Sequence, residues 1–121
     1  MNHLAESWTR GGEHIVYQQC AGCGKRWYFE RAFCPHCGKD APVGVTASGA
    51  GRVIAVTLVH RAPDDAFRAI APYALVLVDA DEGFRLMAHA DPTLAVGDRV
   101  HASVRTIAGR RLPWFDKNAS P

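Results

Sequence analysis

The sequence has no long hydrophobic run. Its longest apolar stretch, Ala71–Val78, is strand-sized and is interrupted by Pro72, whereas a membrane-spanning helix needs about 18 to 20 apolar residues. The first residues, Met1–Glu6, also lack the basic and then apolar pattern of a secretory signal peptide. We therefore expect a cytoplasmic protein with reduced thiols and no membrane segment.

The chain also lacks an excess of charge of one sign. It carries 14 lysine and arginine residues against 12 acidic residues, for a formal net charge of +2. Acids and bases are interleaved, as in the segments 61–68 and 79–85. A nucleic-acid-binding domain of this size usually gathers a basic excess on one face, so the charge pattern argues against nucleic acid as a partner.

Motifs for catalysis are missing as well. No Walker or dinucleotide-binding glycine pattern occurs, and Ser48 stands in Ser-Gly-Ala-Gly instead of a G-x-S-x-G nucleophile elbow. His60, His89 and His101 lie on or beside predicted strands, where a histidine is more often a surface or core-edge residue than an acid–base catalyst. We therefore expect no catalytic residue in this chain.

What the sequence does have is a compact array of cysteines. Cys20, Cys23, Cys34 and Cys37 are the only four in the chain and form a C-x2-C-x10-C-x2-C pattern. A glycine follows each pair and lets the backbone turn under a metal, so the pattern predicts a rubredoxin-like zinc ribbon. Four thiolates close a tetrahedral sphere, which predicts structural zinc, with iron as the alternative ion. His36 is expected to be an exposed loop residue and not a ligand.

Short β-strand patterns dominate the rest of the chain. Strands are predicted for residues 51–59, 73–80, 83–90, 99–107 and 112–115, separated by turn residues. About five strands without a strong helix signal are typical of a small barrel. The five-stranded OB-fold is the leading architecture in this size range.

The N-terminal third carries weaker signals. Residues 3–10 predict one short helix with Leu4 and Trp8 on one face. Residues 25–33 are predicted to form a hairpin strand and its return, with aromatic side chains packed on the metal turns: Trp27, Tyr28, Phe29 and Phe33. The sequence thus predicts a mainly β protein, with a short N-terminal helix in 1–13, a zinc ribbon in 14–46, an OB-fold in 47–115 and a flexible tail in 116–121.

An ordered set of segments after the cysteines indicates a protein family. They are Ser48–Val53, the strand Ala55-Val56-Thr57, Ala71–Ala74, Asp81–Leu86 and Leu94–Val100. Together with the cysteines they resemble the acyl-CoA-associated zinc-ribbon and OB-fold family known as domain of unknown function 35, over nearly the whole chain. The resemblance implies a non-catalytic accessory subunit that docks on a thiolase-superfamily protein, or on an aldolase of thiolase fold, in a hetero-oligomer. It also implies that the subunit helps to bind or channel an acyl-CoA.

A coenzyme A ester needs cations for its phosphates and an apolar surface for its adenine and pantetheine arm. Arg52, Arg61 and Tyr73 lie in or next to the family-like segments and are the expected contacts. The loop 62–72 is long for a small barrel and is a candidate binding or docking loop. The alternative function is single-stranded nucleic-acid binding, which needs basic residues interleaved with stacking aromatics on one barrel face.

Overall fold

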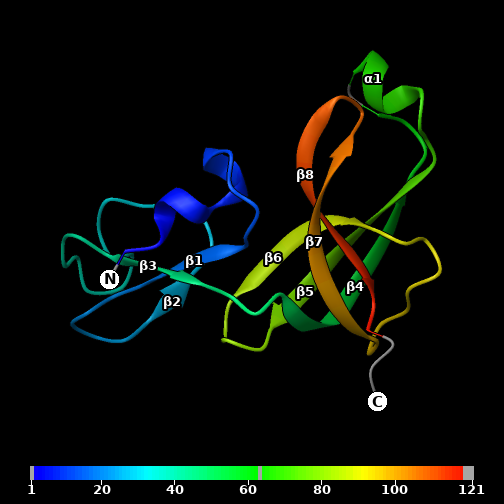
Figure 1. Ribbon diagram of the computed structural model, residues 1–121. Helices are drawn as coiled ribbons and strands as arrows, with labels where there is room; N and C mark the ends of the chain where they lie inside the picture. The colour runs from blue at the N-terminus through cyan, green and yellow to red at the C-terminus, as the bar shows by residue number, and fades with distance from the viewer. Residues whose placement is uncertain (1, 63, 119–121) are drawn as a thin grey trace.

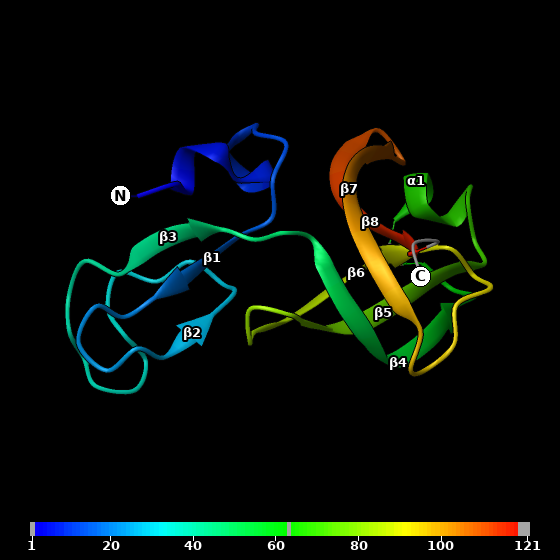
Figure 2. The ribbon, with the colours of Figure 1, turned by 60° about the horizontal axis from the view of Figure 1, so that its bottom comes forward.

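Two β modules lie side by side in the computed structural model, which describes residues 2–62 and 64–118 (Figure 1, Figure 2). The N-terminal module is a three-stranded sheet, and the C-terminal module is a closed five-stranded barrel. This mainly β architecture confirms the predicted fold class.

The N-terminal sheet has its most buried strand in the centre. Strand β1 (Val16–Gln19) pairs antiparallel with β2 (Arg26–Trp27) on one side and with β3 (Val43–Thr46) on the other. No strand was predicted at β3, since Gly44 interrupts its apolar pattern and glycine is depleted in strands.

The predicted N-terminal helix is replaced by two 3-10 turns, η1 (Leu4–Glu6) and η2 (Trp8–Arg10). Ser7 separates them because its backbone is extended and its hydroxyl accepts a hydrogen bond from the Thr9 amide at 3.2 Å. The turn η1 lies directly on β3. A side chain at Gly44 would place its Cβ 2.7 Å from Leu4 Cγ, so only glycine allows this close approach.

The barrel comprises β4 (Ala50–Val59), β5 (Tyr73–Ala80), β6 (Arg85–Ala90), β7 (Arg99–Ile107) and β8 (Arg110–Lys117). Its strand order is β4-β5-β6-β8-β7, closed by pairing of β7 with the start of β4. All pairs are antiparallel except β6 with β8. This is the arrangement of an OB-fold.

The connection from β4 to β5 carries one short helix, α1 (Asp65–Arg68). Asp64 caps it by accepting a hydrogen bond from the Phe67 amide at 2.9 Å. In the described residues no helix has the length and apolarity to cross a bilayer. At the other end of the chain β8 runs to Lys117, so the expected tail does not begin at residue 116; residues 119–121 lie outside the described part.

One hydrophobic core extends through both modules. Within the barrel the largest of the side chains that are at most 2 % exposed are Val53, Val76, Val78, Val100 and Phe115. Phe84 carries the core into the N-terminal sheet, because its ring stacks on Tyr17 with centroids 4.7 Å apart and faces Tyr28 at 5.9 Å. The two modules are therefore packed together through an aromatic layer.

Candidate functional site

The two cysteine pairs fold into turns with the same hydrogen bonds. In the first turn the Cys20 amide donates to the Lys25 carbonyl at 2.9 Å, and the Gly24 amide donates to the Cys20 carbonyl at 3.0 Å. The second turn repeats both bonds from Cys34 and Gly38, at 2.8 and 3.0 Å. Gly24 and Gly38 have φ angles of 76° and 80°, in the left-handed region that favours glycine.

These turns bring the four sulfur atoms together. All four Sγ atoms lie within 4.8 Å of one another, with Cys20 and Cys37 3.5 Å apart and Cys23 and Cys34 3.6 Å apart. Sulfurs about 2.3 Å from a tetrahedral zinc are roughly 3.8 Å from each other, whereas a disulfide requires about 2.05 Å. The cysteines therefore fit a structural zinc site and not a disulfide pair.

Backbone amides favour the thiolate form of the two buried cysteines. Two turn amides, including that of Cys23, donate to Cys20 Sγ at 3.3 and 3.4 Å. The Cys23 amide is the main cause that lowers the pKa of Cys20 from 9.0 to about 6. Burial raises the pKa of Cys34, but hydrogen bonds from the amides of Cys37 and His36, together with those from the neighbouring thiols, outweigh it, and the pKa is lowered.

A metal held by these four sulfurs would have no free position for water or substrate. The centre can cross-link its two turns but cannot bind a reactant. His36 is exposed, and its ring is not one of the clustered ligand groups. Across residues 2–62 and 64–118, the four cysteines are the only cluster of three or more His, Cys, Asp or Glu side chains able to hold a metal.

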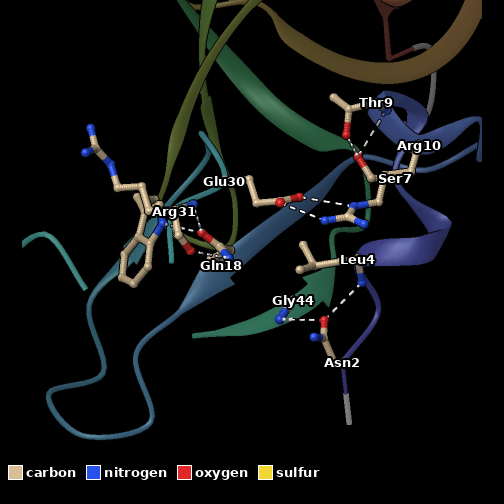
Figure 3. Close-up of polar contacts among 10 residues, drawn as sticks. Asn2, Leu4, Ser7, Thr9, Arg10, Gln18, Glu30, Arg31 and Gly44 are labelled. Atoms are coloured by element: carbon tan, nitrogen blue, oxygen red, sulfur yellow. Dashed lines mark hydrogen bonds and ion pairs between the residues drawn. The ribbon is translucent and has the colours of Figure 1, made fainter. Parts of the chain in front are cut away.

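The loop between the metal turns is held by side chains, and the predicted return strand is not formed. Only Arg26–Trp27 pairs with β1 in the stretch 25–33. The buried amide of Gln18 takes the place of a strand: its Oε1 accepts from Trp27 Nε1 at 2.7 Å and from the Arg31 amide at 2.6 Å, and its Nε2 donates to the Arg31 carbonyl at 3.1 Å (Figure 3). One polar side chain thus fixes the loop on the sheet.

Two aromatic side chains of this loop are exposed, so the prediction that they pack on the metal turns was wrong. Phe29 is 77 % exposed and Phe33 is 59 % exposed. The strand β2 ends before them, and Glu30 forms a two-bond ion pair with Arg10 at 2.7 and 3.2 Å that holds the loop beside η2 (Figure 3). The result is an apolar surface on a loop of fixed position.

His89 lies in an aromatic cluster at the α1 end of the barrel. Its ring stacks on Phe67 at 5.4 Å and contacts Tyr73 at 5.0 Å. The residue is 9 % exposed, and its buried Nδ1 has no hydrogen-bond partner in the described structure. Burial lowers the pKa of His89, which keeps the ring neutral at neutral pH.

A pocket of about 290 Å³ opens beside this ring. Its walls come from both modules: Trp8, Phe67, Leu75, Met87, Ala88, His89, Arg110, Leu112 and Pro113. The sequence did not reveal it because these residues belong to η2, α1, β5, β6 and β8, which are distant in the chain. The one signal was the aromatic Phe67 within the long loop 62–72.

The structure separates the three residues expected to contact coenzyme A. Arg61 follows β4 and is exposed, and Tyr73 pairs with Val59 at the same end of that strand. Arg52 lies seven residues before Val59 on β4, roughly 20 Å away along the strand. Arg52 pairs across the sheet with Asp79. The pKa of Asp81 is lowered mainly by its hydrogen bond from Arg99, and the positive charge of Arg52 lowers it further.

Most exposed arginines are paired with carboxylates. The ion pairs are Arg10–Glu30, Arg68–Asp65, Arg85–Asp79, Arg99–Asp81, Arg105–Asp116, Arg110–Asp64 and Arg111–Glu13. These pairs neutralise positive charge locally. This local balance of charge does not favour the basic stripe that a nucleic-acid-binding barrel needs.

Two family models match consecutive parts of the chain. Residues 8–43 match the model described as "ChsH2, rubredoxin-like zinc ribbon domain", and residues 44–105 match "ChsH2, C-terminal OB-fold domain". The boundary between the two matches falls within β3, the strand that leads from the first module to the second.

The matches to curated relatives span different shares of the length of those proteins. A DUF35 domain-containing scaffold protein of Methanothermobacter thermautotrophicus is 30% identical over 99 residues, which are 78% of this chain and 74% of that protein. A scaffold protein of the same description from Methanocaldococcus jannaschii is 30% identical over 69% of this chain and 60% of its own. A probable enoyl-CoA hydratase alpha subunit of Thermomonospora curvata is 37% identical over 60% of this chain, but the match spans only 22% of that subunit.

Solved structures share the fold of this chain. A chain of the Ltp2-ChsH2(DUF35) aldolase superposes with a TM-score of 0.74 and 28% identity, covering 93% of this chain and 88% of that one. A DUF35-family protein of unknown function from Sulfolobus solfataricus has a TM-score of 0.54 at 18% identity, which shows a shared fold.

Proposed function

Because the chain belongs to the ChsH2 family of rubredoxin-like zinc-ribbon and OB-fold proteins, of DUF35 type, we propose that it is a non-catalytic accessory subunit. It docks on a thiolase-superfamily protein or a thiolase-fold aldolase and helps to bind or channel an acyl-CoA in the cytoplasm. The observation that carries the proposal is the similarity to a chain of the Ltp2-ChsH2(DUF35) aldolase over 93% of this chain. The relatives described as scaffold proteins and as an enoyl-CoA hydratase subunit support the same role.

The cysteines have a structural part in this function. Zinc held by Cys20, Cys23, Cys34 and Cys37 would cross-link the two metal turns and leave no site for a reactant. The turns begin and end the loop that carries Phe29 and Phe33. The metal therefore contributes to docking by holding that loop in place.

Phe29 and Phe33 are the side chains we assign to the partner interface. Exposed aromatic side chains on a fixed loop are typical anchors, because they bury a large apolar area with little loss of conformational freedom. The Arg10–Glu30 ion pair and the Gln18 amide hold this loop before any partner arrives. The partner surface is expected to be apolar at its centre.

The proposed contacts to coenzyme A are Arg61 and Tyr73 at the α1 end of β4, and Arg52 at its other end. Arg61 is exposed and stands next to the loop 62–72, so its guanidinium is available to a phosphate. A ligand that reached all three residues would lie along β4. Arg61 and Tyr73 alone form a more compact site.

Co-purification tests the docking proposal. The chain is tagged in its native host, and bound proteins are identified by mass spectrometry and size-exclusion chromatography. We expect a thiolase-fold protein in a fixed ratio to the chain. Recovery of the chain alone, with no affinity for CoA esters, would contradict the proposal.

The matched variants Phe29→Glu and Val96→Glu separate the interface from general surface effects. Both side chains are exposed, at 77 % and 67 %, but Val96 lies in the barrel loop before β7. We expect Phe29→Glu to weaken partner binding about tenfold or more, as anchor residues do, and Val96→Glu to leave it unchanged. Equal affinities for both variants would place the interface elsewhere.

Acyl-CoA binding is measured in the purified complex by calorimetry. Arg61→Ala removes a charged hydrogen-bond donor, so we expect the affinity to fall about tenfold or more. Arg105→Ala is the control, because Arg105 is already paired with Asp116. An unchanged affinity in Arg61→Ala would remove Arg61 from the site without affecting the docking result.

A further inference from the structure

The pocket beside His89 is closed on one side by the zinc-ribbon module. Trp8 belongs to η2, and its Nε1 donates to the Tyr28 hydroxyl at 2.7 Å, which fixes the indole on the ribbon. Arg111 on β8 pairs with Glu13 at 2.6 Å and ties the barrel wall to the same module. The pocket therefore exists only while the two modules stay packed together.

The pocket wall is almost entirely apolar. Its apolar lining includes Trp8, Phe67, Leu75, Met87 and Leu112. The single full charge in the wall is Arg110, which lies over the Phe67 ring and 3.7 Å from an Asp64 oxygen. Since this carboxylate balances the guanidinium, the pocket favours an uncharged ligand over an anion.

His89 is the one polar group in the wall that is both buried and without a partner. Buried polar atoms in folded proteins nearly always have a hydrogen-bond partner. The Nδ1 of His89 has none among the described residues, although its ring is held between Phe67 and Tyr73. The chain thus keeps a hydrogen-bonding group in an apolar wall that nothing in the described structure satisfies.

We propose that this pocket binds an uncharged hydrocarbon group that bears a hydroxyl, with the hydroxyl hydrogen-bonded to the His89 imidazole. The hydroxyl donates its hydrogen bond to the unprotonated Nδ1 of the neutral imidazole, which an ether oxygen cannot do. A volume of about 290 Å³ is at the lower end of ligand sites, so it fits a small molecule or one end of a larger one. This inference goes beyond the proposed docking function and does not depend on it.

Access to the imidazole depends on Phe67. This side chain covers one face of the ring and is carried by α1, a helix of only four residues. We expect the Phe67 ring to shift when the hydroxyl enters. The amide signals of α1 should therefore change together with those of the pocket wall.

Titration of the zinc-loaded full chain with 1-octanol, followed by NMR, tests the proposal. 1-Methoxyheptane is the matched probe, since it has the same number of heavy atoms but cannot donate a hydrogen bond. We expect saturable shifts at the Trp8 indole, the Met87 methyl group and the α1 amides. One hydrogen bond should make 1-octanol bind about three- to tenfold more tightly than the ether.

Two variants locate the binding site. His89→Phe keeps an aromatic ring in the stack and should abolish the preference for the alcohol. Met87→Glu, at a side chain 61 % exposed on the pocket wall, should weaken both probes, whereas Val96→Glu should weaken neither. Met87→Glu tests the site even where His89→Phe does not fold.

The proposal is overturned if saturating 1-octanol leaves the Trp8 and Met87 signals unchanged. It is also overturned if the wild-type chain binds both probes equally, or if Met87→Glu binds them as Val96→Glu does. Because these measurements use the chain without a partner, their failure leaves the docking proposal standing, and failure of docking leaves this pocket standing.

Discussion

At the scale of the residue, His89 shows how a distant segment changes the character of a side chain. The alternation of residues 83–90 places His89 on the outward side of β6 with Arg85 and Met87, which are both exposed. His89 is nevertheless buried, because Phe67 from α1 covers its ring. Periodicity shows which side of a strand a residue occupies, but it cannot show what another segment places over it.

The buried imidazole predicts a pH dependence of stability. Burial lowers the pKa of His89 from its ordinary 6.5, so below that pH the unfolded chain binds more protons than the folded chain. We expect the free energy of unfolding to decrease as the pH falls from about 7 to about 5, and His89→Phe to reduce this decrease. Urea denaturation across this range measures it.

Two controls isolate the histidine in that experiment. His60→Phe changes an exposed imidazole and should leave the pH dependence as it is in the wild type. Metal content is measured at each pH, because protons also compete with a metal for thiolates. Identical pH dependence in the wild type and His89→Phe at constant metal content would contradict the prediction.

At the scale of the element, the barrel could be predicted from the sequence and the ribbon only in part. The strands β5 and β7 have the predicted bounds, 73–80 and 99–107. The first is a near-continuous apolar run followed by an acidic turn, and the second alternates after the turn at Gly97-Asp98. The strand β3 and the loop 28–33 could not be predicted. Gly44 interrupts the apolar pattern of the strand. The loop is held by hydrogen bonds between the Gln18 side chain and the backbone, and such contacts leave no periodic pattern in the sequence.

Gln18→Ala is predicted to release the loop 28–33. Gln18 is 2 % exposed, and its amide satisfies the Arg31 amide and carbonyl and the Trp27 indole. Leaving such groups without partners costs about 1–3 kcal/mol each at most, so we expect faster hydrogen exchange at Arg31 and a lower free energy of unfolding. Gln19→Ala, at the half-buried neighbour, is the control. Equal exchange at Arg31 in both variants would show that the loop is held by other contacts.

At the scale of the whole molecule, Phe84 is a buried contact between the two modules. It is 5 % exposed, and its ring stacks with Tyr17 and with Tyr28 of the ribbon module. Phe84→Ala is expected to cost about 3–5 kcal/mol, as for other buried aromatic side chains, and to loosen the ribbon from the barrel. Phe29→Ala removes an exposed ring of the same size and should have little effect. Denaturation and small-angle scattering compare the two variants, and similar results for both would contradict the role of Phe84.

Metal removal tests the same coupling between the modules by perturbing the ribbon. The ribbon has strands of two to four residues and little core of its own, so it depends on the metal cross-link, whereas the barrel has a closed sheet around a buried core. We therefore expect a chelator under reducing conditions to remove the NMR dispersion of β1–β3 while the β4–β8 signals persist, and zinc to restore the ribbon. Because Trp8 lines the His89 pocket, the affinity for 1-octanol should fall when the ribbon unfolds and recover when zinc is added. Simultaneous loss of the barrel signals would mean that the two modules fold as one cooperative unit. An unchanged ribbon spectrum after complete metal removal would mean that Gln18 and Phe84 hold the ribbon without the metal.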